Sequence, residues 1–61
     1  MRLLSSTDLA IALAVKNGTL RLVERPSRFG DTFIAIEDDR GLIEVHNTRA
    51  EADARVARCR P

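Results

Sequence analysis

The feature that most restricts the fold of this chain is its short length combined with the lack of a covalent or metal staple. Its 61 residues include one cysteine, Cys59, and one histidine, His46, so neither an intrachain disulfide nor a tetrahedral Cys/His zinc site can form. A chain of this size buries only about 60% of its unfolded surface. Such folds usually need a staple or a partner subunit. We therefore predict one small domain, residues 1–61, that self-associates or docks onto a partner.

The composition indicates a globular chain with balanced charge. Hydrophobic residues make up 44% and charged residues 31%, which is not the pattern of a disordered protein. Ten basic and nine acidic side chains give a net charge of +1. Nucleic-acid-binding domains usually carry a clear basic excess, because neutralising phosphates supplies most of their affinity. The overall charge therefore argues against nucleic acid as the main ligand.

The N-terminal segment lacks the pattern of an export signal. Polar residues 5–8 interrupt its apolar run and leave only residues 9–15, the shortest length for the apolar part of a signal peptide. No stretch approaches the roughly 20 apolar residues of a membrane span. The lone cysteine also fits a reducing compartment. We expect a cytoplasmic protein with no membrane partner.

The last thirteen residues predict a helix over 48–59. Thr48 and Glu51 form a capping box, in which the threonine hydroxyl accepts from the third amide of the helix. Glu51 also precedes Arg55 by four residues, a favourable spacing for an ion pair. Residues with high helix propensity fill the interior: Ala50, Ala52, Ala54 and Ala57.

Three strand-like runs, 19–25, 31–37 and 42–46, lie between turn residues and predict an antiparallel meander. The second turn, 38–41, fits a type I turn with Gly41 in the left-handed position of a bulge. Apolar alternation predicts which side chains face the C-terminal helix: Leu20, Leu22, Ile34, Ile36, Ile43 and Val45.

The first segment, 7–16, fits either a helix or a strand. Ser6 or Thr7 followed by Asp8 is typical of a helix start, and Asn17-Gly18 of a helix end. Yet apolar residues alternate strictly with alanines, and Asn-Gly also favours a hairpin. We favour the helix, which predicts an α+β fold of order α-β-β-β-α. The strand alternative gives a four-stranded meander with one helix.

The sheet face opposite the helix is the predicted contact surface. Val23, Phe33 and Leu42 fall on it, and an uncovered apolar patch of this kind usually marks an interface. The acidic cluster at residues 37–39 could meet a basic partner surface. Adding the arginines of the first strand gives the residues expected to contact a protein partner: Arg21, Val23, Arg25, Phe33, Leu42, Glu37, Asp38 and Asp39.

No catalytic, cofactor or metal site is predicted. His46 and Glu44 could share a proton, but no motif places a nucleophile beside them. Cys59 has flanking arginines that could make it reactive, yet it lies on the apolar stripe of the predicted helix. Residues 37–39 lack the spacing of a calcium loop. We therefore expect neither enzymatic activity nor a small-molecule substrate.

Two groups of arginines support a nucleic-acid alternative. One lies on the first strand and its turn, where the exposed sheet face could lie along a groove. The other lies near the end of the C-terminal helix, where basic side chains also stabilise the helix dipole. The residues of this alternative are Arg21, Arg25, Arg28, Arg55 and Arg58.

Residues 9–21, LAIALAVKNGTLR, resemble the spacing of helix-turn-helix regulators and excisionases. The resemblance implies that segment 7–25 reads DNA, with Thr19 to Arg25 on the recognition helix. The sequence departs from that pattern at Lys16, in the usual cap position, and at Gly18, inside the second helix.

Residues 19–59 resemble, in the order of their elements, the three-strand-plus-helix arm-binding domain of tyrosine recombinases. The stretch from His46 to Ala52 is similar to the Thr-x-x-Glu-Ala helix entry of that family. The resemblance implies a sheet that inserts into the DNA major groove, although the acidic residues 37–39 oppose such contact.

The sequence as a whole favours a non-enzymatic protein-interaction module, with a homodimer as one form of that interaction. In size and lack of motifs the chain is similar to small phage-encoded inhibitors, such as anti-restriction and anti-CRISPR proteins. That analogy suggests a phage or mobile-element accessory protein that inhibits or bridges a larger protein. The alternative is a small DNA-binding module that uses segment 7–25 or the sheet.

Overall fold

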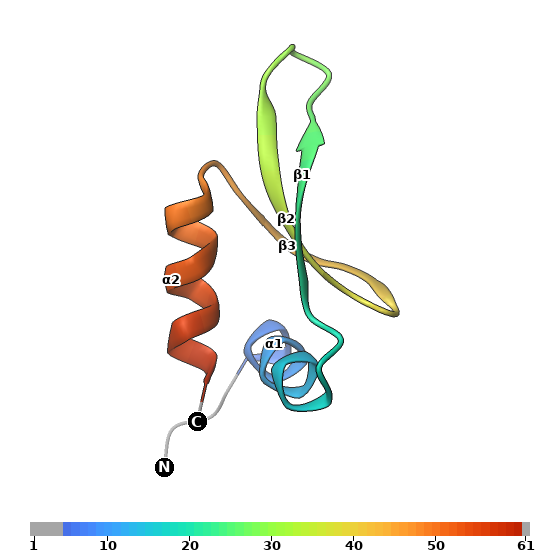
Figure 1. Ribbon diagram of the computed structural model, residues 1–61, viewed down its shortest axis with the longest axis vertical. Coiled ribbons are helices and arrows are strands. Elements are labelled where there is room, and N and C mark those ends of the chain that lie inside the picture. The colour runs from blue at the N-terminus through green and yellow to red at the C-terminus, as the bar shows by residue number, and fades with distance from the viewer. Residues whose placement is uncertain (1–4, 61) are drawn as a thin grey trace.

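Residues 5–60, which the computed structural model describes, form a helix, a three-stranded antiparallel sheet and a second helix (Figure 1). The predicted α+β class and the α-β-β-β-α order are confirmed. The N-terminal segment takes its helical alternative. The elements are α1 (Ser6–Asn17), β1 (Arg21–Pro26), β2 (Thr32–Asp38), β3 (Gly41–His46) and α2 (Arg49–Cys59).

Capping residues define both ends of α1. Ser5 is the N-cap: its hydroxyl accepts from the Asp8 N–H at 3.1 Å, and its own N–H donates to the Asp8 carboxylate at 3.4 Å. The N-cap therefore lies one residue before Ser6 and two residues before Thr7, the two predicted caps. At the other end Gly18 adopts φ +70°, and the N–H of Thr19 donates to the Ala14 carbonyl at 3.0 Å. Asn-Gly thus terminates a helix here and does not form a hairpin.

The helix-turn-helix interpretation of residues 7–25 is wrong, because the predicted recognition helix is a strand. β1 pairs antiparallel with β2, and Leu22 lies opposite Ile36. This pairing buries one side of Leu20 and Leu22 against the core, which the alternating pattern of the strand favours.

The sheet is a meander of order β1-β2-β3, and its second turn falls at residues 38–41 as predicted, although the bulge lies at Ile43 and not at Gly41. The Asp38 carboxylate accepts from the N–H groups of Arg40, at 2.9 Å, and Gly41, at 3.1 Å. Gly41 has φ +126°, and no non-glycine residue among those described has a positive φ. The glycine therefore absorbs the backbone conformation that the tight turn requires.

A β-bulge in β3 overturns one prediction about the core. Glu37 pairs with Leu42, whereas Ile36 pairs with Glu44, so Ile43 is an extra residue on β3. Directly paired residues share a sheet face, so the bulge places Glu44 on the face toward the helices. Val45 then lies on the opposite face, where 48% of its surface is exposed, and not in the core. We call these the inner face and the outer face.

The core lies between the inner face and both helices. The other five strand residues predicted for it do pack there. Within the described residues, only Ile11 and Ile36 are large side chains that are fully buried. The core is therefore thin, as expected for a short chain. Its buried cluster is Ile11, Ile34, Ile36, Ala52 and Val56, with Val15, Leu20, Leu22, Ile43 and Cys59 packed against it. In this part of the chain neither helix has the length and apolar character needed to cross a bilayer.

Candidate functional site

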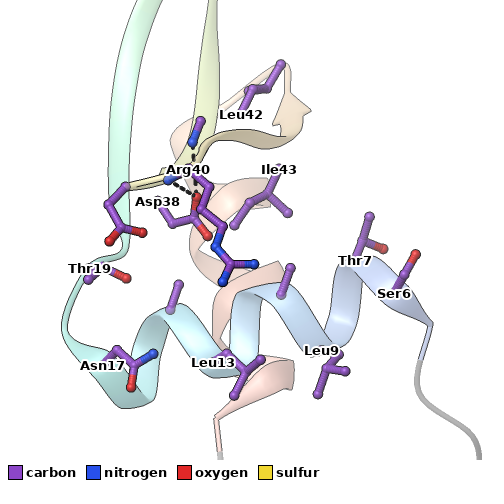
Figure 2. Close-up of a pocket in the computed structure, with 14 residues that line it drawn as sticks. Ser6, Thr7, Leu9, Leu13, Asn17, Thr19, Asp38, Arg40, Leu42 and Ile43 are labelled. Atoms are coloured by element: carbon purple, nitrogen blue, oxygen red, sulfur yellow. Dashed lines mark hydrogen bonds between the residues drawn. The ribbon is translucent and has the colours of Figure 1, made fainter.

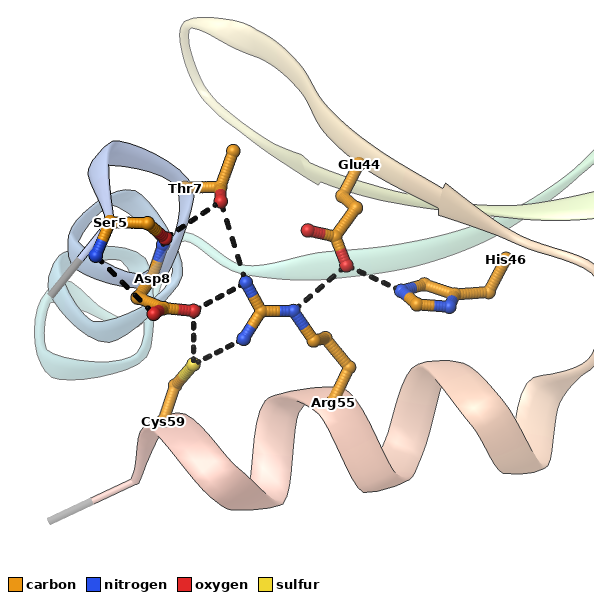
Figure 3. A network of polar contacts seen from close by, with 7 residues as sticks. All are labelled: Ser5, Thr7, Asp8, Glu44, His46, Arg55 and Cys59. Carbon is orange, nitrogen blue, oxygen red and sulfur yellow. Dashed lines mark hydrogen bonds and ion pairs between the residues drawn. The ribbon is translucent and has the colours of Figure 1, made fainter.

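A partly buried polar network joins α1, β3 and α2 through one guanidinium group (Figure 3). The Arg55 side chain is only 13% exposed and forms two ion pairs. Its Nε donates to Glu44 Oε1 at 2.9 Å, and its Nη2 lies 2.5 Å from Asp8 Oδ1. His46 Nε2 lies 2.5 Å from the same Glu44 oxygen. One arginine thus holds three elements together.

The network keeps its carboxylates ionised. The hydrogen bond from Arg55 lowers the pKa of Glu44 against the opposing effect of partial burial. The same guanidinium, with help from Ser5, lowers the pKa of Asp8. These two carboxylates in turn raise the pKa of Arg55, chiefly through the hydrogen bond with Glu44. At neutral pH the centre is therefore a cation between two anions.

This network corrects the pairing predicted along α2. Arg55 turns inward to Asp8 and Glu44 and does not pair with Glu51. The ion pair at i,i+4 spacing on α2 is instead Arg49 with Asp53, at 3.4 Å, and both side chains are exposed. Arg55, which the nucleic-acid alternative included, therefore has its charge committed within the fold.

The residues considered for catalysis are also part of this network. Cys59 packs against the core, and its sulfur accepts from Arg55 Nη1 at 3.2 Å. The same thiol lies 3.9 Å from Asp8 Oδ1. Within residues 5–60, no three His, Cys, Asp or Glu side chains are placed to hold a metal ion. The contacts of this cluster join elements of the fold.

The outer face carries a row of small apolar side chains. Val23, Ala35 and Val45 lie directly opposite one another across the three strands. The core forms on the other side of the sheet, so neither helix covers this row (Figure 1). Leu42, on the same face, is 62% exposed, whereas Phe33 and Val23 are partly buried and Ala35 is buried. The structure thus gathers the apolar residues that the strand pattern placed on this face.

The charged residues predicted on the outer face are largely satisfied by one another. Arg25 donates two hydrogen bonds to the Glu37 carboxylate, from Nε to Oε2 at 2.8 Å and from Nη2 to Oε1 at 3.0 Å. The bond from Arg25 lowers the pKa of Glu37. Arg21 donates to the backbone carbonyl of Asp38 at 3.2 Å. Of the predicted acidic cluster, Glu37 is buried, Asp38 is half-buried and only Asp39 is exposed.

A groove that the sequence did not reveal lies between α1 and the β2–β3 turn (Figure 2). Its volume is about 560 Å³. Its lining includes Leu9 and Leu13 of α1, which are 50% and 47% exposed, and Leu42 of β3. The sequence feature that could have indicated this groove is the presence of apolar residues on two different faces of α1. Ile11 faces the core, so the leucine pair at i,i+4 spacing must face elsewhere.

The arginines of the nucleic-acid alternative do not gather into one surface. Arg25 is neutralised by Glu37, and Arg55 lies in the buried network. Arg21 is on the outer face, Arg28 is in the β1–β2 turn, and Arg58 is exposed on α2. The positive charge available to a phosphate backbone is therefore smaller and more dispersed than the sequence indicated.

No family model matches this sequence, and no curated protein or solved structure is significantly similar to it. The geometry of the outer face, the groove and the buried network therefore carries the functional argument.

Proposed function

We propose that this chain is a non-enzymatic protein-interaction module whose outer sheet face binds a partner protein. The observation that carries the proposal is the exposure of Val45 and Leu42, 48% and 62%, on a sheet face that neither helix covers. The residue at the centre of this face, Ala35, has a small side chain. A second layer of protein structure can therefore pack closely against the sheet. Contiguous apolar surface of this kind favours a contact surface over a solvated one.

The charges of the outer face indicate the chemistry of the partner. Arg25 and Glu37 neutralise each other. A partner can therefore cover this face without leaving either charge buried and unpaired. Arg21 is exposed and bonds only to a neutral carbonyl in the described structure. The partner therefore presents a flat apolar surface with a carboxylate opposite Arg21.

The strand edges support docking on the face over strand addition at an edge. β1 ends in Pro26 and alternates with charged side chains, and β3 contains the bulge at Ile43. Proline, edge charges and bulges all oppose pairing with a further strand. The partner consequently contacts side chains of the outer face more than the backbone.

The size of the face sets the strength of binding. Three strands about 4.8 Å apart, each about 20 Å long, span a few hundred Å². A standard interface buries roughly 800 Å² on each partner. We therefore propose transient binding, with a dissociation constant of about 1 µM or weaker. The module would occlude or bridge a larger cytoplasmic protein, as small phage-encoded inhibitors do.

A charge placed on the outer face tests the proposal. Tagged wild-type protein, Val45→Glu and Leu13→Glu are used to capture partners from a lysate of the source cells, with quantification by mass spectrometry. Val45 and Leu13 are similarly exposed but lie on different surfaces. We expect a captured protein that is lost with Val45→Glu and retained by Leu13→Glu. Equal capture by all three proteins, or no specific capture, overturns the proposal.

The DNA-binding alternative is distinguished by its salt dependence. If DNA is the ligand, fluorescence anisotropy with duplex DNA will show tight binding, and the affinity will fall steeply as salt is added. It would also show strong loss in an Arg21→Glu, Arg28→Glu double variant, since both side chains are exposed. That result, together with capture sensitive to nuclease, would replace the protein partner with nucleic acid.

A further inference from the structure

The centre of the outer face is closely covered, although both helices pack on the other side of the sheet. Ala35, on the middle strand, is 1% exposed, and Glu37, two residues further along that strand, is 8% exposed. The core and the helices that enclose it lie on the inner face. Side chains of the outer face itself must therefore cover this centre.

The register of β1 and β2 identifies the side chains that cover it. Val23 and Ala35 lie directly opposite each other, and Arg25 and Glu37 each follow two residues later on their own strands. Because the strands are antiparallel, Arg25 and Glu37 lie on opposite sides of this pair, about 13 Å apart along the strands. Nevertheless Arg25 donates to both oxygens of Glu37, at 2.8 Å and 3.0 Å. Such contact requires both side chains to lie flat along the face, over Val23 and Ala35.

We propose that the Arg25–Glu37 ion pair is a strap that shields the apolar centre of the outer face in the free chain and releases it when Arg21 takes over Glu37. The Arg25 side chain is 51% exposed and that of Glu37 is 11% exposed, so the arginine forms the outward side of the strap. An ion pair with one partner in water is held weakly. The strap therefore opens at modest cost.

Arg21 is the residue that makes this opening possible. It lies directly opposite Glu37 on the same face, and its guanidinium now donates to the neutral backbone carbonyl of Asp38 at 3.2 Å. The pKa of Glu37 is lowered chiefly by the hydrogen bond from Arg25, and the charge of Arg21 acts in the same direction. When Arg25 moves away, Arg21 can pair with Glu37, so the carboxylate is not left without a cation.

The strap determines how much of the outer face a partner can reach, a consequence that rests on the proposed function. With the strap closed, the well-exposed apolar side chains of this face are Val45 and Leu42 on β3. Opening adds Val23 and Ala35, which extends the contact surface across all three strands. The two arginines exchange roles, so the face still offers one guanidinium to a carboxylate of the partner protein.

The rate of thiol labelling at Val23→Cys tests the shield on the purified full chain. A maleimide reagent is used, and peptide mass spectrometry separates the label at position 23 from that at Cys59. We expect Arg25→Gln to raise the rate at position 23 by about threefold or more, as for loss of one partly exposed ion pair. Glu37→Gln should raise it in the same direction.

Two controls separate the strap from general loosening of the sheet. Glu24→Gln removes a charge from the same strand, but Glu24 lies opposite Ile34 on the inner face, so the labelling rate at position 23 should not change. Val45→Cys lies on the outer face away from the strap, and its rate should be the same with Arg25 and with Arg25→Gln. Circular dichroism verifies that each variant is folded.

Titration of the Glu37 carboxyl by NMR tests the exchange of arginines. In Arg25→Gln the pKa of Glu37 should stay below its ordinary value, because Arg21 replaces the lost cation. In the double variant Arg21→Gln, Arg25→Gln it should return to that value or above it. A pKa of Glu37 that is the same in the single and double variants would remove the role of Arg21.

The labelling and capture experiments fail in distinguishable ways. Unchanged labelling at position 23 in both Arg25→Gln and Glu37→Gln overturns the strap, and so does an equal rise at position 45. Unchanged labelling together with partner capture that depends on Val45 leaves the proposed function in place without the strap. Faster labelling without any specific capture supports the strap and removes the proposed function.

Discussion

Arg55 is the residue on which the relative positions of the elements depend most. Its guanidinium reaches Asp8 on α1 and Glu44 on β3 from its place on α2. Because its side chain is only 13% exposed, water could not fully solvate the two carboxylates if the guanidinium were removed. Removing the cation would leave two carboxylates close together in a poorly solvated site.

We expect Arg55→Met to lower the free energy of unfolding by about 2 kcal/mol, less than for a fully buried ion pair because both carboxylates retain some solvent. Arg49→Met is the matched control, since Arg49 forms an exposed ion pair on the same helix and should contribute about 0.5 kcal/mol or less. Urea denaturation of both variants measures the difference. Similar losses in the two variants would contradict the central role of Arg55.

Stability should also fall in acid. The pKa values of Asp8 and Glu44 are lowered from their ordinary values of 3.8 and 4.5 by hydrogen bonds from Arg55. A carboxyl with a lowered folded-state pKa stabilises the fold above its unfolded pKa. That contribution is lost as pH falls through the folded-state value.

The urea midpoint should therefore be steady from about pH 7 to about pH 5 and should decrease below that. Arg55→Met should show a smaller acid-dependent decrease, because its carboxylates have lost the bonds that lower their pKa. The remaining decrease reports Glu37, whose pKa is lowered by Arg25, together with the bonds that Ser5 and His46 still make to Asp8 and Glu44. A midpoint that is constant or rises in acid would show that these ion pairs do not stabilise the fold.

The role of Arg55 could not be predicted from local sequence. Glu51, four residues earlier on the same helix, satisfies the simple spacing rule, yet the real partners come from α1 and β3. Glu44 faces Arg55 only because the bulge at Ile43 changes the phase of the strand. Apolar alternation places Glu44 outside, so the network becomes visible only once the tertiary structure is known.

At the scale of the elements, α1 depends on the glycine that ends it. Gly18 has φ +70°, a left-handed conformation that disfavours side chains with a Cβ. A Cβ built at this position meets no atom within 4 Å, so the cost of substitution is conformational and not steric contact with neighbours.

Gly18→Ala should therefore destabilise the protein by about 1 kcal/mol, and Gly18→Asn by clearly less, because asparagine tolerates this conformation. Thermal unfolding followed by circular dichroism compares the three proteins. Equal stability of the alanine variant and the wild type would mean that the end of α1 rearranges without cost.

The elements themselves were largely predictable because their ends are set locally. Thr48 accepts from the Glu51 N–H at 3.2 Å, as the capping pattern predicts. Asp38 and Gly41 form the turn that their residue types favour. The choice between helix and strand for residues 7–16 was open in the sequence, since an Asn-Gly pair suits both. Packing of Ile11 against the inner face favours the helix.

At the scale of the whole molecule, a thin core lies between two open apolar surfaces. The outer face was predictable in part, because alternation along the strands assigns Val23, Phe33 and Leu42 to one side but places Val45 in the core. The groove was not, because it depends on where α1 docks against the β2–β3 turn. The sequence contains the leucines, but only the docking of α1 determines which of them stay in water.

The open surfaces link stability to concentration. If this chain forms a homodimer through either open surface, unfolding converts one dimer into two chains, and the midpoint of thermal unfolding must rise with protein concentration. A charge placed in the interface, Leu13→Glu for the groove or Val45→Glu for the outer face, should make the midpoint independent of concentration. Differential scanning calorimetry over a 100-fold dilution series, about two decades of mass action, measures this. A wild-type midpoint that does not move would show that the thin core of the monomer is sufficient by itself, since a dimer bound only in the folded state cannot avoid this shift.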